Sequence, residues 1–163
     1  MSTILIIEDD YAVQELFVDE LASDGHNVVT AGEVESISAK IKSWNPDLVV
    51  ADFYIRRRHR WDVLMDIKKE HPTLPVIIAA AYDYYRNDPR LLLADGYWIK
   101  SYCFDALKEK IGEVLQRKQT NPFPQQEERT EDGKTNRYAI DKDEEQLCNG
   151  RQAMRLVHSW RRA

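Results

Sequence analysis

Four carboxylates and one lysine stand where they could bind a metal ion and accept a phosphoryl group. Glu8, Asp9 and Asp10 follow the apolar run ILII, Asp52 follows LVVA, and Lys100 follows GYWI. Carboxylates that share a cleft repel one another, and some become protonated unless a cation lies among them. Mg²⁺ meets that need because it prefers oxygen ligands and binds through one or two carboxylates together with phosphate oxygens. These residue types therefore indicate a magnesium site.

Asp52 is the predicted nucleophile of this set, and Lys100 is its predicted electrostatic partner. A carboxylate can attack a phosphoryl group to give an aspartyl phosphate. Such transfers depend on positioning and on neutralising the phosphoryl oxygens, which a metal on one side and an ammonium on the other can do. A single acid would more often cap a helix, and Asp9 or Asp10 is a candidate N-cap. Acids and a lysine at several strand ends favour a phosphoryl-accepting site instead.

The elements that must position these residues alternate regularly along the first 118 residues. Five apolar runs are continuous rather than alternating, which indicates strands that are covered on both faces. Apolar residues at helical spacing lie between the runs, as at Val13, Phe17 and Leu21. The predicted strands are residues 4–7, 26–31, 47–51, 75–81 and 96–100.

This alternation predicts an α/β fold, a doubly wound five-stranded parallel sheet with helices on both faces. The expected strand order is the flavodoxin-like 2-1-3-4-5, and ligands of such sheets bind beyond the carboxyl ends of the strands. Glu8, Asp52, Ala80 and Lys100 all lie at that edge. The fold would therefore bring the candidate site residues together.

The composition changes after this region, and we expect one folded domain over residues 1–118. Residues 119–163 begin with a polar stretch that contains two prolines and is typical of a linker or disordered tail. Further on, Met154, Val157 and Trp160 could line one face of a short helix. That segment could dock on the domain or on a partner.

The net charge and the lengths of the apolar runs argue against nucleic-acid and membrane partners. A net charge of −5 with 31% charged residues suits a cytoplasmic protein and makes nucleic acid an unexpected partner. The apolar runs are far shorter than the roughly 20 residues that span a bilayer, so no membrane partner is expected. The N-terminus MSTILIIEDD lacks the basic region of a secretory signal.

The runs ILIIEDD, DLVVAD, PVIIAAAY and GYWIK, in this order, resemble the receiver domain of bacterial response regulators in two-component signalling. The resemblance covers residues 3 to 117. It implies that Asp52 is the phosphoacceptor and that Glu8 and Asp9 are the acids of the Mg²⁺ site, with Asp10 as the reserve.

The same resemblance implies that Lys100 contacts the phosphoryl group and that Tyr97 is the aromatic switch residue. Two substitutions depart from the family pattern on this side. Ala80 stands where the family has Thr or Ser, and Ser101 replaces a proline that usually follows a cis peptide. A non-proline cis bond costs about 2.5–4 kcal/mol, so we expect a trans bond after Lys100. The predicted metal-binding acids are therefore all present, whereas Ala80 and Ser101 on the predicted switch side differ from the family pattern.

Two loops also depart from the family pattern. The segment from Ala80 to Lys100 is shortened, and Asp88 with Pro89 predicts a helix of barely two turns. Arginines replace the family's Pro and Gly in the stretch RRRHR at 56–60. Three interpretations of this stretch stay open: a solvated loop that softens the acidic field, a docking site for an acidic partner, and a nucleic-acid contact.

On these grounds we expect the function of a stand-alone receiver. It would take a phosphoryl group on Asp52 from a histidine kinase or phosphotransfer protein, with Mg²⁺ as cofactor, and act on a downstream protein target. A homodimer stays open. We expect no turnover enzyme, although the site should slowly hydrolyse its own phosphoaspartate.

Two alternatives come from other classes. A phosphorylation-independent interaction scaffold is favoured by Ala80 and Ser101 and opposed by the intact acids. A phosphatase or flavin-binding protein on a similar sheet is disfavoured, because no Gly-rich phosphate loop follows the first strand.

Overall fold

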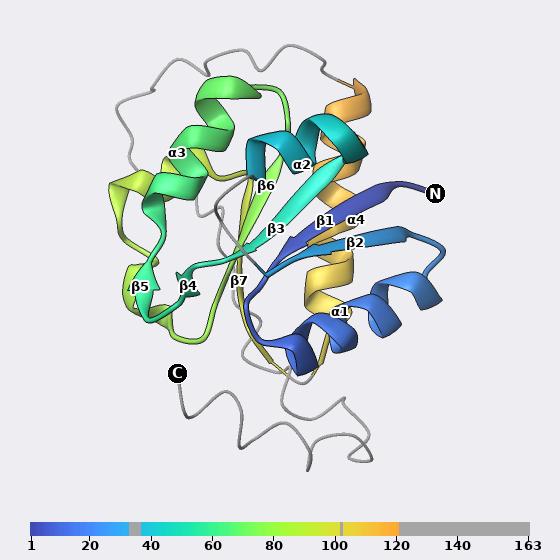
Figure 1. Cartoon of the computed structure of the whole chain (residues 1–163), viewed down its shortest axis with the longest axis horizontal. Helices are drawn as coiled ribbons and strands as arrows, with labels where there is room; N and C mark the ends of the chain where they lie inside the picture. The colour runs from blue at the N-terminus through green and yellow to red at the C-terminus, as the bar shows by residue number, and fades with distance from the viewer. Residues whose placement is uncertain (33–36, 102, 121–163) are drawn as a thin grey trace.

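The computed structural model of the chain describes residues 1–32, 37–101 and 103–120. Within these ranges, five parallel strands form one sheet in the order β2-β1-β3-β6-β7 (Figure 1). Because β6 and β7 are the fourth and fifth of the predicted strands, the predicted fold and strand order are confirmed. The strands are β1 (Thr3–Ile7), β2 (Asn27–Ala31), β3 (Leu48–Asp52), β6 (Val76–Ala80) and β7 (Gly96–Ile99).

Helices cover both faces of this sheet (Figure 1). α1 (Tyr11–Ser23) and α4 (Asp105–Thr120) pack on one face, and α2 (Ile37–Trp44) and α3 (Trp61–Glu70) pack on the other. Alternate strand residues enter the two cores, so that the residues of one strand are buried on both sides. This explains why the strands read as continuous apolar runs.

The described residues end inside the predicted tail. α4 extends to Thr120, and residues 121–163 lie outside the described ranges. The domain boundary near 118 and the character of the tail therefore stay predictions. Within the described residues, no helix is both long enough and apolar enough to cross a membrane.

The segment between β6 and β7 differs from the predicted α-helix. It holds two short 3₁₀ helices, η1 (Asp83–Tyr85) and η2 (Pro89–Leu93). Asp88 caps η2 as predicted, and its carboxylate accepts a hydrogen bond from the backbone N–H of Arg90 at 2.9 Å. A 3₁₀ helix rises about 2.0 Å per residue, against about 1.5 Å in an α-helix, so it suits a shortened connection.

The stretch after Asp52, expected as a loop, forms a small hairpin. β4 (Tyr54–Ile55) pairs antiparallel with β5 (Arg58–His59), and the two residues between them make the turn. The hairpin lies at the same edge of the sheet as the carboxyl end of β3 (Figure 1). It therefore stands beside the predicted site.

Candidate functional site

The sheet register brings the candidate residues to one edge. Ile7 of β1 pairs with Ala51 of β3, so Glu8 and Asp52 are the next residues along two neighbouring strands. Lys100 follows the last residue of β7, and its backbone N–H donates to the carbonyl of Ala80 at 2.8 Å. Residues far apart in the sequence thus meet because parallel strands end together.

The Lys100 ammonium joins the two buried carboxylates. Its Nζ lies 2.6 Å from Oε2 of Glu8 and 2.9 Å from Oδ2 of Asp52, and the three side chains are 7%, 3% and 9% exposed. Buried charges are costly unless they are paired and their remaining atoms are hydrogen-bonded. Here the second Glu8 oxygen accepts from the N–H of Asp10 at 3.1 Å, and the second Asp52 oxygen accepts from the N–H of Tyr54 at 2.9 Å. These bonds fix both carboxylates in place.

Three carboxylates are close enough to share a metal ion. Glu8, Asp9 and Asp52 each offer an oxygen, and these oxygens lie within 4.8 Å of one another. In an octahedral Mg²⁺ site with ligands at about 2.1 Å, oxygens lie about 3 Å apart when adjacent and about 4 Å apart when opposite. The set therefore fits Mg²⁺ after small side-chain adjustments. Asp9 is exposed, which leaves one side open to water and to a phosphoryl oxygen.

The hairpin after β3 holds Asp9. The backbone N–H of Arg56 donates to Oδ2 of Asp9 at 2.8 Å, and the N–H of Arg60 closes the hairpin onto the carbonyl of Phe53 at 3.0 Å. Arg56 and Arg57 form the turn with φ of 50° and 62°. Both angles are left-handed, as a two-residue type I′ turn requires. A left-handed φ costs a residue such as arginine about 1–2 kcal/mol of conformational free energy, so the turn is strained.

Asp10, the reserve ligand, has a different role in the structure. Its carboxylate accepts hydrogen bonds from the N–H groups of Ala12 at 2.9 Å and Val13 at 3.3 Å. It is the N-cap of α1 and is not among the clustered carboxylates of the described residues. Of the three consecutive acids, Glu8 and Asp9 face the cleft, and Asp10 is the N-cap of α1.

Electrostatics favour a further cation at this cleft. Burial raises the pKa of Glu8 to about 7, against the opposing effect of Lys100, and the charge of Asp52 adds to the rise. Burial lowers the pKa of Lys100, but the carboxylates of Asp52 and Glu8 outweigh this, and its pKa is raised overall. Lys100 is therefore cationic at neutral pH and is shared between two acids. With Asp9 beside them, the negative charges exceed the single ammonium.

The profile of the response regulator receiver domain family matches residues 4–111 of the chain. This chain belongs to the response regulator receiver family. Among curated relatives, it is 29% identical over 117 residues to the probable transcriptional regulatory protein TcrX of Mycobacterium tuberculosis, covering 71% of this chain and 50% of that one. It is 32% identical over 122 residues to the probable C4-dicarboxylate response regulator DctR of Bacillus subtilis, covering 71% and 53%. The chain thus spans about half the length of these relatives.

Solved receiver structures share the fold. The response regulator TrrA of Thermotoga maritima, in complex with Mg²⁺-BeF, is 34% identical with a TM-score of 0.66, covering 70% of this chain and 99% of TrrA. TrrA in complex with the histidine kinase ThkA matches with 35% identity and a TM-score of 0.65, covering 71% and 99%. The resemblance found in the sequence is therefore confirmed, and the chain contains a two-component receiver domain.

The structure describes the three positions that the sequence analysis assigned to the switch, and that assignment stays a prediction. Ala80 is buried at the end of β6 and has no hydroxyl to donate. The Lys100–Ser101 peptide is trans. Tyr97 is buried, its hydroxyl donates to the carbonyl of Tyr82 at 2.8 Å, and burial raises its pKa to about 12. The aromatic ring is thus anchored inside the receiver.

An aromatic cluster that the sequence analysis missed links two loops of the receiver. The ring of Phe53, directly after Asp52, lies 4.4 Å from the rings of both Trp61 and Tyr85. The Tyr85 hydroxyl is also hydrogen-bonded to Nε2 of His59. The hairpin after β3 and the η1 loop after β6 are therefore in direct contact. The aromatic residues on both sides of the arginines were the signal that could have indicated it.

Proposed function

We propose that this receiver accepts a phosphoryl group on Asp52 from a histidine kinase or a phosphotransfer protein and signals through protein contacts. The observation that carries the proposal is the meeting of Glu8, Asp9, Asp52 and Lys100 in one cleft. The similar TrrA forms complexes with Mg²⁺-BeF and with a histidine kinase, which supports the same chemistry here.

Each residue has a proposed role. An Asp52 oxygen forms the new bond to phosphorus while the bond to the donor nitrogen breaks. Glu8 and Asp9 hold Mg²⁺ together with Asp52, and the ion, when bound, supplies positive charge to the phosphoryl oxygens. Lys100 supplies positive charge from the opposite side. The phosphoaspartate carries about −1.5 to −2 charges in place of the single negative charge of the Asp52 carboxylate.

The route of output is also part of the proposal. Residues 119–163 are short and polar, so we expect output through contact with a protein target rather than through a DNA-binding module in this segment. The acidic, charged composition agrees with a cytoplasmic protein. Slow loss of the phosphoryl group by hydrolysis is the only turnover we expect.

Incubation with a small phosphodonor and Mg²⁺ tests the central step. The intact mass should increase by one phosphoryl group, and Asp52→Asn should abolish the increase. Asp10→Asn is the matched control, because asparagine also caps a helix and the increase should persist. An unmodified wild-type mass, or an increase retained in Asp52→Asn, would overturn the proposal.

A phosphorylation-independent scaffold is the second candidate. Ala80 favours it, because the side chain at the end of β6 has no hydroxyl that could donate a hydrogen bond to a phosphoryl oxygen. Partner binding by wild-type protein and by Asp52→Asn separates the two functions. Equal binding with and without phosphodonor favours the scaffold. A difference that disappears in Asp52→Asn favours phosphorylation-dependent signalling.

A further inference from the structure

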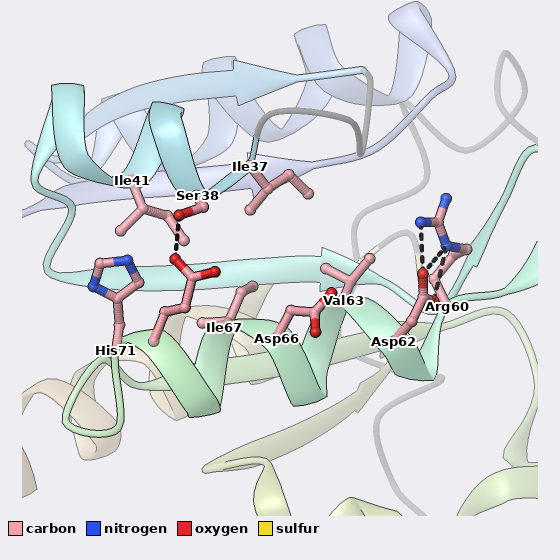
Figure 2. A pocket seen from close by; sticks show the side chains of 10 residues that line it. Ile37, Ser38, Ile41, Arg60, Asp62, Val63, Asp66, Ile67 and His71 are labelled. Atoms are coloured by element: carbon pink, nitrogen blue, oxygen red, sulfur yellow. Dashed lines mark hydrogen bonds and ion pairs between the residues drawn. The ribbon is translucent and has the colours of Figure 1, made fainter.

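A groove between α2 and α3 lies outside the phosphoacceptor cleft (Figure 2). It encloses about 220 Å³. Ile37 and Ile41 from α2 face Val63 and Ile67 from α3 across it, as Figure 2 shows. The groove therefore has an apolar floor made by two helices.

The α3 side of the groove is acidic. Asp62, Asp66 and Glu70 recur every four residues along α3 and line the groove. Figure 2 labels Asp62 and Asp66 on the groove side of the helix. Asp62 pairs with Arg60 at 2.7 Å, and Glu70 accepts a hydrogen bond from Ser38 and lies 3.9 Å from the Lys42 ammonium. Asp66 has no hydrogen bond or ion pair with any other described residue. Like charges at this spacing destabilise a helix by a few tenths of a kcal/mol, and a cationic neighbour would relieve them.

We propose that residues 151–162 of the same chain dock in this groove as a short helix. Their sequence, RQAMRLVHSWRR, combines apolar and cationic residues. On a helix with 3.6 residues per turn, Met154, Val157 and Trp160 fall on one side, while Arg151 and Arg155 fall on the other. The first set suits the apolar floor. The long arginines can reach over the apolar contact to the acidic side.

The length of the proposed helix agrees with the length of the acidic side of α3. From Asp62 to Glu70, α3 rises about 12 Å, and a helix from Arg151 to Arg162 would rise about 16 Å. The docked segment would therefore cover the length of the acidic side. Arg151, Arg155 and Arg162 share one side of this helix, and their charge complements Asp66, which has no cationic partner among the described residues.

The described chain ends at the same edge of the sheet as one end of this groove. Near the end of α4, the Lys118 ammonium donates to the carbonyl of Asp47 at 3.1 Å. Asp47 lies three residues after Trp44, the last residue of α2. In Figure 1 the carboxyl ends of α2, α3 and α4 lie at the same edge of the molecule. The tail thus starts at the sheet edge where one end of the groove lies, although α4 itself packs on the opposite face of the sheet.

The connecting segment is long enough to return. Residues 121–150 separate α4 from the proposed helix, and a chain of thirty residues can reach at most about 100 Å. Tethering by such a linker gives an effective concentration in the millimolar range. Even a segment that binds the groove with low affinity would then be bound most of the time.

The test uses the full chain and the indole N–H signal of Trp160 in a ¹H–¹⁵N spectrum, assigned with Trp160→Phe. We expect a signal shifted from its random-coil position, with nuclear Overhauser contacts to Ile41 and Ile67. Asp66→Lys should return the signal to the random-coil position. Asp19→Lys makes the same charge change at an exposed site on α1 and should leave the signal unchanged.

A charge swap adds a second readout. Arg155→Glu should also release Trp160, and the combination with Asp66→Lys should restore part of the shift. A random-coil Trp160 in the wild-type chain, or contacts that survive Asp66→Lys, would overturn the proposal. A shift that grows with protein concentration would also overturn it, because the groove would then hold the tail of a second copy.

The docking does not depend on phosphorylation. The same spectra recorded on Asp52→Asn, which cannot accept a phosphoryl group under the proposed function, should show the same Trp160 shift. Failure of the phosphodonor experiment therefore leaves the docking result standing, and failure of the docking result leaves phosphorylation standing.

Discussion

At the scale of single residues, Glu8 controls the charge balance of the cleft. It is 3% exposed, and its two oxygens are bonded to Lys100 and to the N–H of Asp10. Burial raises its pKa to about 7, so near neutral pH a proton and a metal ion compete for the same carboxylate. The protonation of Glu8 therefore links stability and metal binding.

This linkage predicts a pH dependence of stability in the metal-free protein. The folded state keeps the Glu8 proton up to a pH of about 7, whereas the unfolded chain releases it near 4.5. The contribution of Glu8 to folding is thus fully present below about pH 4.5 and is lost as the pH rises through about 7. Urea unfolding between about pH 5 and 8 should show this loss.

Glu8→Gln removes the titration and is the control. The variant should lack this part of the pH dependence, so the difference in unfolding free energy between wild type and variant should change with pH. A difference that stays constant over this range would contradict the raised pKa of Glu8.

Asp9 and Asp10 are neighbours with different expected roles. Asp10→Ala removes the N-cap of α1 and should cost about 1 kcal/mol of unfolding free energy, with Mg²⁺ affinity little changed. Asp9→Ala removes a proposed metal ligand and should lower Mg²⁺ affinity by tenfold or more. Calorimetric Mg²⁺ titration and chemical denaturation measure the two effects, and the reverse assignment would refute the proposed roles.

At the scale of elements, the β4–β5 hairpin gives a structural reason for the basic residues that follow Asp52. Its turn directs the N–H of Arg56 to Asp9, and Arg60 pairs with Asp62 on α3. The left-handed angles of Arg56 and Arg57 are a local strain next to the site. The hairpin is thus a structural support of the acidic cleft, whatever its arginines bind.

Relieving the strain should stabilise the receiver. Arg57→Gly should raise the unfolding free energy by about 1 kcal/mol, because glycine adopts a positive φ without steric cost. Arg58→Gly, in the adjacent strand β5, should instead lower it by about 0.5–1 kcal/mol. Chemical denaturation measures both, and equal effects at the two positions would argue against a left-handed turn.

The elements also show where sequence reasoning succeeded. Strand and helix positions followed from apolar runs and periodicity, because each face of the sheet is buried under helices. The hairpin could not be predicted in the same way, since Arg-Arg is not a residue pair that favours a type I′ turn. The 3₁₀ helix at Pro89 depends on the distance that the shortened connection must cover, which a local pattern does not contain.

At the scale of the whole molecule, the doubly wound sheet creates the site from distant segments. Glu8, Asp52 and Lys100 stand at the carboxyl ends of three different strands, and the common direction of those strands brings them together. The rule that ligands bind at the carboxyl edge therefore sufficed to place them from sequence. It could not give the shared contact of Lys100 with both acids or the N–H of Arg56 at Asp9, because these depend on side-chain packing and on one turn.

The most direct test of the central claim is a crystal structure of the full chain with Mn²⁺ in place of Mg²⁺, using anomalous scattering to find the ion. Mn²⁺ shares the preference of Mg²⁺ for oxygen ligands. We predict one ion bound by Glu8, Asp9 and Asp52, with Lys100 on the far side of Asp52. An ion bound elsewhere, or an Asp52 carboxylate turned away from Glu8 and Asp9, would contradict the account.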